Sequence, residues 1–323
     1  RQRAEVLLDV PATVDAFTAK DIKAAGIERP QDFIALTPGL SQVQTAEIGD
    51  IQVNIRGINT GRDTETNFAL VIDGVLQTNP AALNQELNSV SQIEVLKGPQ
   101  GAVYGRNAVA GAIILSTRKP ADEFELDVGA GAGSDASYKA NFWAGGPLAG
   151  SVKGSLSGYY RTTDGQWDNR FLRCDDCVDY YEETGVQGRL LFELGSGRYD
   201  FKAKYSTAEA GAINFNAALA LADAAAGLNV PIFQEDVNQH VFQYINNVKP
   251  VNEQENFNLS LKGEWGIGAN TLTGYVAYNK QDNNFVTDGT SAAFNLYSTT
   301  SSCISSNDAR RADTPVPPPF FYA

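Results

Sequence analysis

The chain has 323 residues, which is enough for two domains, and it carries a formal net charge of −13. This acidic balance excludes a nucleic-acid partner, because binding to a phosphate backbone needs a basic surface. No apolar run reaches the roughly 18 residues that a membrane-spanning helix needs, so we expect no transmembrane helix.

The acidic charge lies mostly in the second part of the chain. Residues 1–120 contain 11 basic and 13 acidic side chains, a net of −2, whereas the remainder contains 14 basic and 25 acidic ones, a net of −11. This change marks a boundary near Pro120. We therefore predict an N-terminal domain over residues 1–120 and a second domain over residues 121–323.

The first domain is predicted to be an α+β domain with short helices and a small mixed sheet. Thr18 is a typical N-cap for a helix over Ala19–Ala25, and Gly26 follows the end of that helix. A second helical stretch, 31–36, stops at a Pro-Gly pair. We expect the strands at residues 52–55, 68–72, 93–96 and 112–117.

Asp73 and Gly74 interrupt an apolar run and predict a two-residue hairpin turn. The loops 59–67 and 77–83 then emerge at the same end of the sheet, and both are rich in hydrogen-bonding side chains. From composition alone, the simplest explanation is that surface turns are polar.

The most distinctive stretch covers residues 93–120 and reads IEVLKGPQGAVYGRNAVAGAIILSTRKP. Its glycines lie between two strands, where they let the backbone turn sharply and pack closely. The stretch contains no catalytic nucleophile, base or metal cluster. It closely resembles the end of the plug domain of TonB-dependent outer-membrane receptors, and residues 8–120 follow that family's order of motifs.

The resemblance implies two kinds of site in the first domain. The loops that resemble the plug's outward-facing apices are 43–50, 59–67 and 77–83, and in the family such loops contact the ligand. Arg56 and Arg106 match arginines that pair with barrel carboxylates and hold the plug in place, a role that suits a planar guanidinium. The candidate ligand-binding residues are Gln44, Glu47, Asn59, Thr60, Arg62, Asp63, Glu65, Asn67, Gln77, Thr78 and Asn79.

The second domain is predicted to contain antiparallel transmembrane β-barrel strands. Apolar and polar side chains alternate in runs of about 10 residues, which is the length of a tilted membrane strand, whereas soluble strands are shorter. The seven runs are 124–133, 138–145, 151–161, 185–194, 198–207, 256–265 and 271–280. Tight turns at 146–150, 195–197 and 266–270 alternate with long loops at 162–184 and 209–254, an asymmetry typical of outer-membrane barrels.

The polar face of these strands is predicted to point into the barrel lumen, because a membrane wall leaves only the interior for ionised groups. Its charged members are Lys153, Arg161, Arg189, Lys202, Lys204, Lys262 and Glu264. In the loop 209–254 we expect a helical stretch at 217–226, and the loop is either a lid that contacts the ligand or a packed surface loop.

The cysteines and the histidine are too few and too far apart to indicate a metal or catalytic site. Cys174 and Cys177 are close enough in sequence to form a loop disulfide in an oxidising compartment. A zinc site would need two more ligands nearby, whereas Cys303 is distant and His240 is the only histidine. We therefore expect no metal site and no cofactor, and a structural role for His240.

Seven strands are too few to close around such a plug, and barrels of this family have about 22. The barrel is therefore incomplete in this chain. We expect the chain to be the N-terminal portion of a longer protein, with a mature or trimmed start because it begins at Arg1 and contains no Met.

The resemblance implies TonB-dependent active import of a scarce solute across the outer membrane of a Gram-negative bacterium, with TonB contacting a segment upstream of Arg1. The expected partners are TonB, the solute and outer-membrane lipid. Ferric siderophores or other iron chelates are the leading solutes, and an oligosaccharide, cobalamin or haem are alternatives.

Two other classes of protein are weaker explanations. A passive porin-like channel would explain the barrel but not a folded N-terminal domain. A soluble two-domain enzyme would need a convergent polar site, and the glycine-rich stretches match neither a phosphate-binding loop nor a dinucleotide fingerprint. We therefore do not expect an enzyme.

Overall fold

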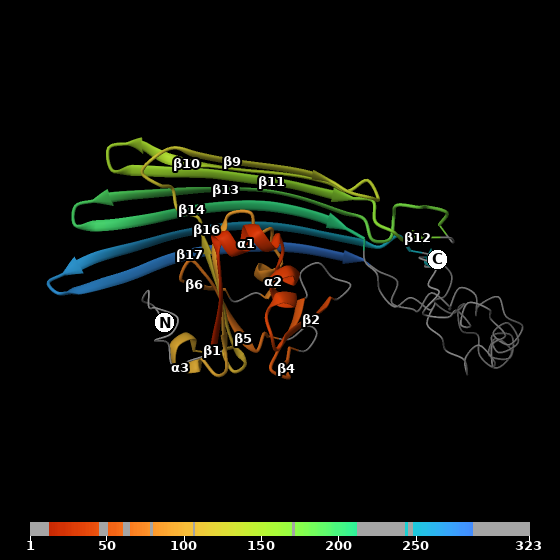
Figure 1. Cartoon of the computed structure of the whole chain (residues 1–323), viewed down its shortest axis with the longest axis horizontal. Coiled ribbons are helices and arrows are strands. Elements are labelled where there is room, and N and C mark those ends of the chain that lie inside the picture. The colour runs from red at the N-terminus through yellow and green to blue at the C-terminus, as the bar shows by residue number, and fades with distance from the viewer. Residues whose placement is uncertain are drawn as a thin grey trace, which may run out of the picture.

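The computed structural model describes residues 13–44, 51–60, 65–77, 80–105, 107–169, 172–211, 243–244 and 248–286. They form an N-terminal domain of two small sheets with short helices, which lies against one face of a long antiparallel sheet (Figure 1). We call the long sheet the wall. No helix among these residues is long and apolar enough to span a membrane.

The main sheet of the N-terminal domain is mixed, as predicted. Its strand order is β1-β7-β8-β5-β6, and only the β5–β8 pair is parallel. The second sheet has the order β2-β3-β4. The strands are β1 Thr13–Thr18, β2 Leu40–Gln44, β3 Ile51–Ile55, β4 Ile58–Asn59, β5 Phe68–Ile72, β6 Val75–Gln77, β7 Val90–Lys97 and β8 Gly111–Thr117.

The helices begin and end close to their predicted positions. Helix α1 (Ala19–Ala25) has a capping box between Thr18 and Asp21, and Gly26 ends it with a φ of 64°. Helix α2 (Pro30–Leu36) begins one residue earlier than predicted, because proline fits the first helical turn. Two further short helices are η2 (Pro80–Leu83) and α3 (Gly101–Tyr104).

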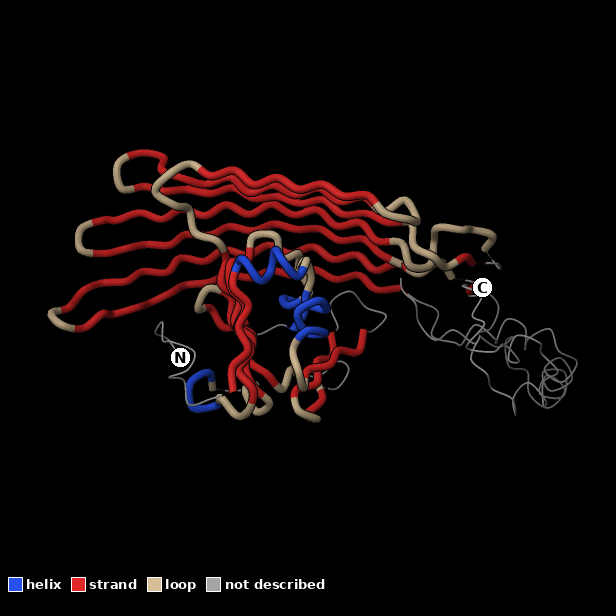
Figure 2. The backbone as a smooth tube through the Cα atoms, viewed as in Figure 1, coloured by secondary structure: helices blue, strands red, loops and turns tan. Residues whose placement is uncertain are grey.

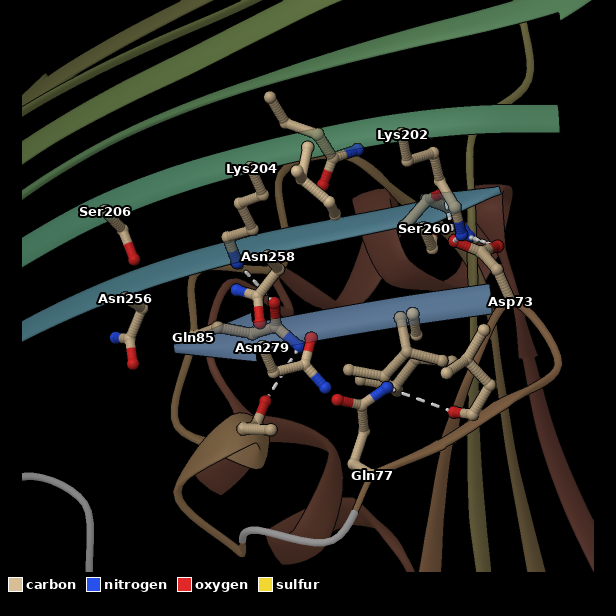
Figure 3. Close-up of a pocket in the computed structure, with 18 of the residues that line it drawn as sticks. Asp73, Gln77, Gln85, Lys202, Lys204, Ser206, Asn256, Asn258, Ser260 and Asn279 are labelled. Carbon is tan, nitrogen blue, oxygen red and sulfur yellow. Dashed lines mark hydrogen bonds and ion pairs between the residues drawn. The ribbon is translucent and has the colours of Figure 1, made fainter. Parts of the chain in front are cut away.

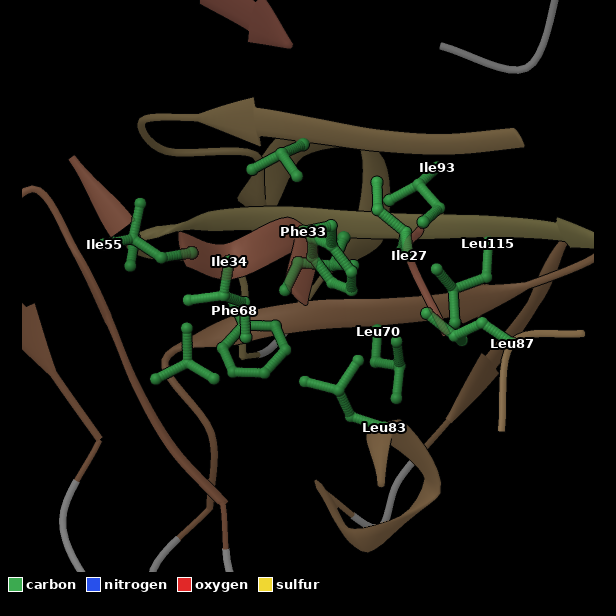
Figure 4. Packing of buried hydrophobic residues seen from close by; sticks show 14 of the residues in the cluster. Ile27, Phe33, Ile34, Ile55, Phe68, Leu70, Leu83, Leu87, Ile93 and Leu115 are labelled. Carbon is green, nitrogen blue, oxygen red and sulfur yellow. The ribbon is translucent and has the colours of Figure 1, made fainter. Parts of the chain in front are cut away.

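The core lies between the main sheet and helix α2. Phe33 and Ile34 of α2 pack against Phe68 of β5 and Ile93 of β7, and all four side chains are at most 2% exposed (Figure 4). The Asp73-Gly74 turn joins β5 to β6, with φ values of 52° and 87°. The predicted hairpin is therefore confirmed.

The wall consists of seven strands in the order β17-β16-β14-β13-β11-β10-β9, all antiparallel (Figures 1 and 2). Its edge strands do not pair with each other, so the described wall is not a closed barrel. The strands are β9 Glu125–Ala132, β10 Tyr138–Ala149, β11 Val152–Thr163, β13 Tyr181–Leu194, β14 Gly197–Ala210, β16 Val251–Ile267 and β17 Asn270–Val286.

All seven predicted wall strands are present, and the turns between them are tighter than predicted. Three hairpins have two-residue turns that begin with Gly150, Gly195 and Gly268, at φ values of 56°, 62° and 60°. These turns all lie at one end of the wall, on the left in Figure 2. A first turn residue with positive φ suits the right-handed twist of paired strands.

The long connections lie at the opposite end of the wall. The loop after β11 contains β12 (Asp168–Asn169), which pairs in parallel with β15 (Gln243–Tyr244) of the loop after β14. The structure joins Cys174 and Cys177 in a disulfide within the first loop, beside the buried Val178. The predicted helical stretch 217–226, His240 and Cys303 lie outside the described residues.

The two faces of the wall differ in chemistry. The face turned away from the N-terminal domain carries large apolar side chains that remain exposed, among them Leu156, Val186, Leu190, Leu261 and Val276. The opposite face carries the predicted charged residues, and several of these contact the N-terminal domain. An apolar outer band and a polar interior are what a membrane barrel requires.

Candidate functional site

Two clusters of charged residues join the N-terminal domain to the wall. The Arg29 cluster lies toward the long loops and comprises Glu28, Arg29, Glu86, Lys139, Tyr159, Arg161, Tyr181 and Glu183. The Asp73 cluster lies toward the tight turns and comprises Asp73, Thr117, Arg189, Asp200 and Lys202. Both combine side chains that are far apart in the sequence.

Arg29 is the centre of the first cluster. It precedes α2, and its backbone N–H donates to the Asp32 carboxylate at 2.8 Å, which fixes the start of the helix. Its guanidinium donates to Glu183 and to the Tyr181 hydroxyl, each at 2.9 Å, and to Asn84 at 3.0 Å. The three partners use the planar donors of one guanidinium, so the arrangement is specific to arginine.

A second arginine of the same cluster comes from the wall. Arg161 donates to Glu86 at 3.0 Å and to Glu28 at 2.7 Å, and Lys139 also pairs with Glu28. Opposite charges thus alternate across the contact: the N-terminal domain contributes one arginine and two carboxylates, and the wall contributes two cations and Glu183. Such pairing stabilises buried charge that would otherwise be costly.

The pKa values of the N-terminal carboxyls differ within this cluster. Burial raises the pKa of Glu86 above its ordinary value, despite the nearby arginines. Partial burial acts in the same direction on Glu28, but hydrogen bonds from Lys139 and Arg161 lower its pKa below the ordinary value. Burial alone would lower the pKa of Arg29, whereas Tyr181, Glu183 and Glu86 raise it, so the arginine stays charged.

The Asp73 cluster holds the hairpin turn against the wall. Lys202 donates to the Asp73 carboxylate at 2.6 Å, and the backbone N–H of Thr117 donates to it at 2.8 Å. Arg189 is 2% exposed; it pairs with Asp200 at 2.6 Å and donates to the Thr117 hydroxyl at 2.8 Å. Burial would raise the pKa of Asp73, but Lys202 and Arg189 lower it below the ordinary value.

A third contact lies where the two domains are joined. Arg118 follows β8, and its guanidinium lies 3.7 Å from the centre of the Trp143 ring. It also donates to Glu125 of β9 at 2.7 Å. This stacking and ion pair fix the direction in which the chain leaves the first domain for the wall.

Of the two predicted locking arginines, the structure describes Arg56. Arg56 occupies an exposed turn between β3 and β4, with a φ of 51°, and its backbone N–H donates to Gly39 at 2.8 Å. Strand β4 lies on the side of the N-terminal domain away from the wall (Figure 1). No described carboxylate pairs with Arg56, and Arg106 lies outside the described residues, so their locking role stays a prediction.

The structure describes part of the predicted ligand site. Asn67 donates to the backbone oxygen of Asn59, so the two ends of that loop lie close together, and Glu65 is exposed. Thr60 is 2% exposed and donates to Val53 at 3.1 Å, which is a structural contact. The side chain of Gln44 and residues Glu47, Arg62, Asp63, Thr78 and Asn79 lie outside the described part of the structure.

Gln77 faces a cavity of about 340 Å³ between the N-terminal domain and the wall (Figure 3). The hairpin β5–β6 and the segment after η2 form one side of this cavity, and β14, β16 and β17 form the other. Its lining is rich in carboxamides and contains three lysines, Lys202, Lys204 and Lys280, of which Lys280 pairs with Asp282. The sequence does not predict this cavity, because the cavity depends on how the two domains pack.

Residues 6–112 match the family model described as TonB-dependent Receptor Plug Domain. The N-terminal domain is a TonB-dependent receptor plug. The segment 93–120, whose glycines suggested this family, forms β7, α3 and β8 of the plug. Such a plug with its wall belongs to the outer membrane of a Gram-negative bacterium.

Known relatives match about half of this chain. The pesticin receptor of Yersinia enterocolitica is 28% identical over 161 residues, which make up 49% of this chain and 24% of that protein. The vitamin B12 transporter BtuB of Vibrio vulnificus is 31% identical over 166 residues, 49% of this chain and 26% of that protein. The chain spans about a quarter of the length of these curated relatives.

Solved structures extend the likeness to the wall. The ferric yersiniabactin uptake receptor FyuA from Yersinia pestis has a TM-score of 0.73 at 20% identity, covering 85% of this chain and 41% of that chain. The fold of our chain is therefore that of a plug followed by the first strands of a TonB-dependent receptor barrel. The charged clusters described above lie between these two parts.

Proposed function

We propose that the full-length protein imports a ferric siderophore or another iron chelate across the outer membrane, with energy delivered through TonB. The observation that carries this proposal is a receptor plug seated by two ion-pair clusters against seven barrel strands. A plug held by many paired charges blocks free diffusion along that side of the lumen. Passage then requires the plug to move, which supports active import over a passive channel.

The iron chelate is favoured by the similar proteins. One solved structure is a ferric yersiniabactin uptake receptor, and it resembles this chain over 85% of its residues. A second candidate is cobalamin, because the relative with 31% identity is a vitamin B12 transporter. No described feature favours haem or an oligosaccharide over these two.

We further propose that the solute is captured by the plug loops 43–50, 59–67 and 77–83 together with the long wall loops. The contact between Asn59 and Asn67 supports it, because it closes one of these loops at the base. The TonB contact is assigned to a segment upstream of Arg1. The proposed role is binding and transport, with no catalysed reaction.

The imported solute can be identified by comparing uptake in two strains: a deletion strain, and the same strain carrying the gene. Both strains receive radioactive iron as a panel of ferric siderophores and, separately, radiolabelled cobalamin. We expect gene-dependent uptake of at least one iron chelate. Uptake of cobalamin alone would replace the iron proposal with cobalamin transport, and uptake of neither would remove both.

A further inference from the structure

Lys204 differs from the other basic residues on the inner face of the wall. Five of the six predicted there lie within 4.0 Å of a carboxylate, for example Lys202 with Asp73 and Lys262 with Glu264. Within the described residues, no carboxylate lies that close to Lys204. The other three paired residues are Lys153, Arg161 and Arg189.

The two carboxylates that attract Lys204 electrostatically, Glu183 and Glu86, already pair with arginines. Glu183 accepts from Arg29 at 2.9 Å, and Glu86 accepts from Arg161 at 3.0 Å. The described partner of the Lys204 ammonium is the side-chain oxygen of Gln85, a neutral amide. An ammonium group has three donors, so this single neutral acceptor leaves it able to bind an anion.

Two asparagines on the neighbouring strands share the cavity with Lys204, and the carboxylates of Asp73 and Glu86, which pair with other cations, also line it. In the antiparallel register, Lys204 of β14 faces Asn258 of β16, and Asn258 faces Asn279 of β17. All three side chains line the 340 Å³ cavity, where Figure 3 shows them close to Gln85. Within the described residues, neither asparagine side chain makes a hydrogen bond, so their amide N–H groups remain available.

We propose that this cavity binds a carboxylate or phosphate group of a small polar molecule. Lys204 supplies the charge, the amides of Asn258 and Asn279 supply further donors, and the anion displaces Gln85 from the ammonium. Charge-assisted hydrogen bonds of this type are stronger than neutral ones. The volume lies at the lower end of the range for ligand pockets, about 300–1,000 Å³, so the site holds a compact molecule or one arm of a larger one.

Lys204 itself lies outside the loops proposed to capture the imported solute, although Gln77 and Ala82 of the loop 77–83 also line the cavity. Lys204 lies in the middle of β14, seven residues after its start at Gly197 and six before its end at Ala210. Titration measures binding of a free anion, whereas uptake measures import of the solute, so failure of one proposal is distinguishable from failure of the other.

Calorimetric titration of the full-length protein in detergent tests the site. The probes are inorganic phosphate and glycolate, which distinguish a phosphate from a carboxylate ligand. We expect saturable binding of at least one probe. Lys204→Met should weaken it about tenfold or more, because one charge-assisted contact is lost. Lys262→Met is the matched control, since it removes a paired lysine from the same wall, and should leave the affinity unchanged.

A second variant separates anion binding from a purely structural role of Lys204. Gln85→Leu removes the competing neutral acceptor, so affinity for the probe should rise where Lys204→Met lowers it. Should Lys204→Met lose the heat-dependent gel mobility of a folded barrel, Lys204→Gln takes its place. Absence of saturable binding in the unmodified protein, or equal effects of the Lys204 and Gln85 variants, would overturn the proposal.

Discussion

Arg29 and Lys23 both reach from the plug to the wall, but they differ in burial. The Arg29 side chain is 11% exposed and lies 2.9 Å from Glu183, whose side chain is 5% exposed. Lys23 is 82% exposed and lies 4.0 Å from Asp127. Water screens an exposed pair, which then contributes little, whereas a buried charge that loses its partner is costly.

This difference gives a paired prediction. Arg29→Ala leaves Glu183 buried without its cation, a loss of roughly 3–5 kcal/mol, and should loosen the plug. Lys23→Ala should have no measurable effect. Hydrogen exchange of backbone amides in α1, α2 and β7 measures plug mobility: we expect faster exchange in the Arg29 variant only. Equal exchange in the two variants would mean that the Arg29 cluster does not hold the plug.

The contacts of single residues were the hardest feature to predict from the sequence. The period-two pattern placed Arg161, Arg189 and Lys202 on the inner face of the wall, and the structure confirms these positions through their contacts with the plug. The pattern contains no information on which plug residues they meet. Arg29 was therefore missed, since nothing in its local sequence distinguishes it from a surface arginine before a helix.

At the level of elements, all seven wall strands were predicted, but six of them were predicted too short; β9 is instead shorter than its predicted range, 124–133. Strand β13 begins at Tyr181 rather than at residue 185, and β16 begins at Val251 rather than at residue 256. Apolar alternation ends where the membrane ends, but backbone hydrogen bonding between strands continues into the polar region. In β13 this extension includes Glu183, the partner of Arg29, so the missed residues include one that contacts the plug.

Two glycines of β13 test how closely the wall packs. A Cβ added to Gly185 would lie 2.4 Å from the Tyr159 ring, which is buried and donates to Glu183 at 2.6 Å. Gly185→Ala should therefore displace the ring and destabilise the protein by about 1–3 kcal/mol, as overpacking does.

Gly188→Ala is the control in the same strand, because an added Cβ there meets no atom within 4 Å. The temperature at which each variant loses its heat-dependent gel mobility compares them. We expect a lower temperature for Gly185→Ala and no change for Gly188→Ala. Identical temperatures would show that Tyr159 moves aside without cost and does not fix the Arg29 cluster.

At the level of the whole molecule, the sequence predicted two parts but not their contact. The change in charge and periodicity near Pro120 separates the plug from the wall, and the glycine-rich stretch pointed to the family. How the plug sits against the wall depends on pairs more than 100 residues apart, such as Arg29 with Glu183 and Asp73 with Lys202. One chain's local pattern does not specify such pairs.

The dependence of uptake on the proton-motive force tests the central claim most directly. Cells that produce the full-length protein are loaded with the radioactive solute identified by the uptake panel, with and without a protonophore. Active import predicts that the protonophore abolishes accumulation while binding at the cell surface persists, because the plug then stays seated against the wall. Accumulation at an unchanged rate after the protonophore would contradict active import and identify a passive channel.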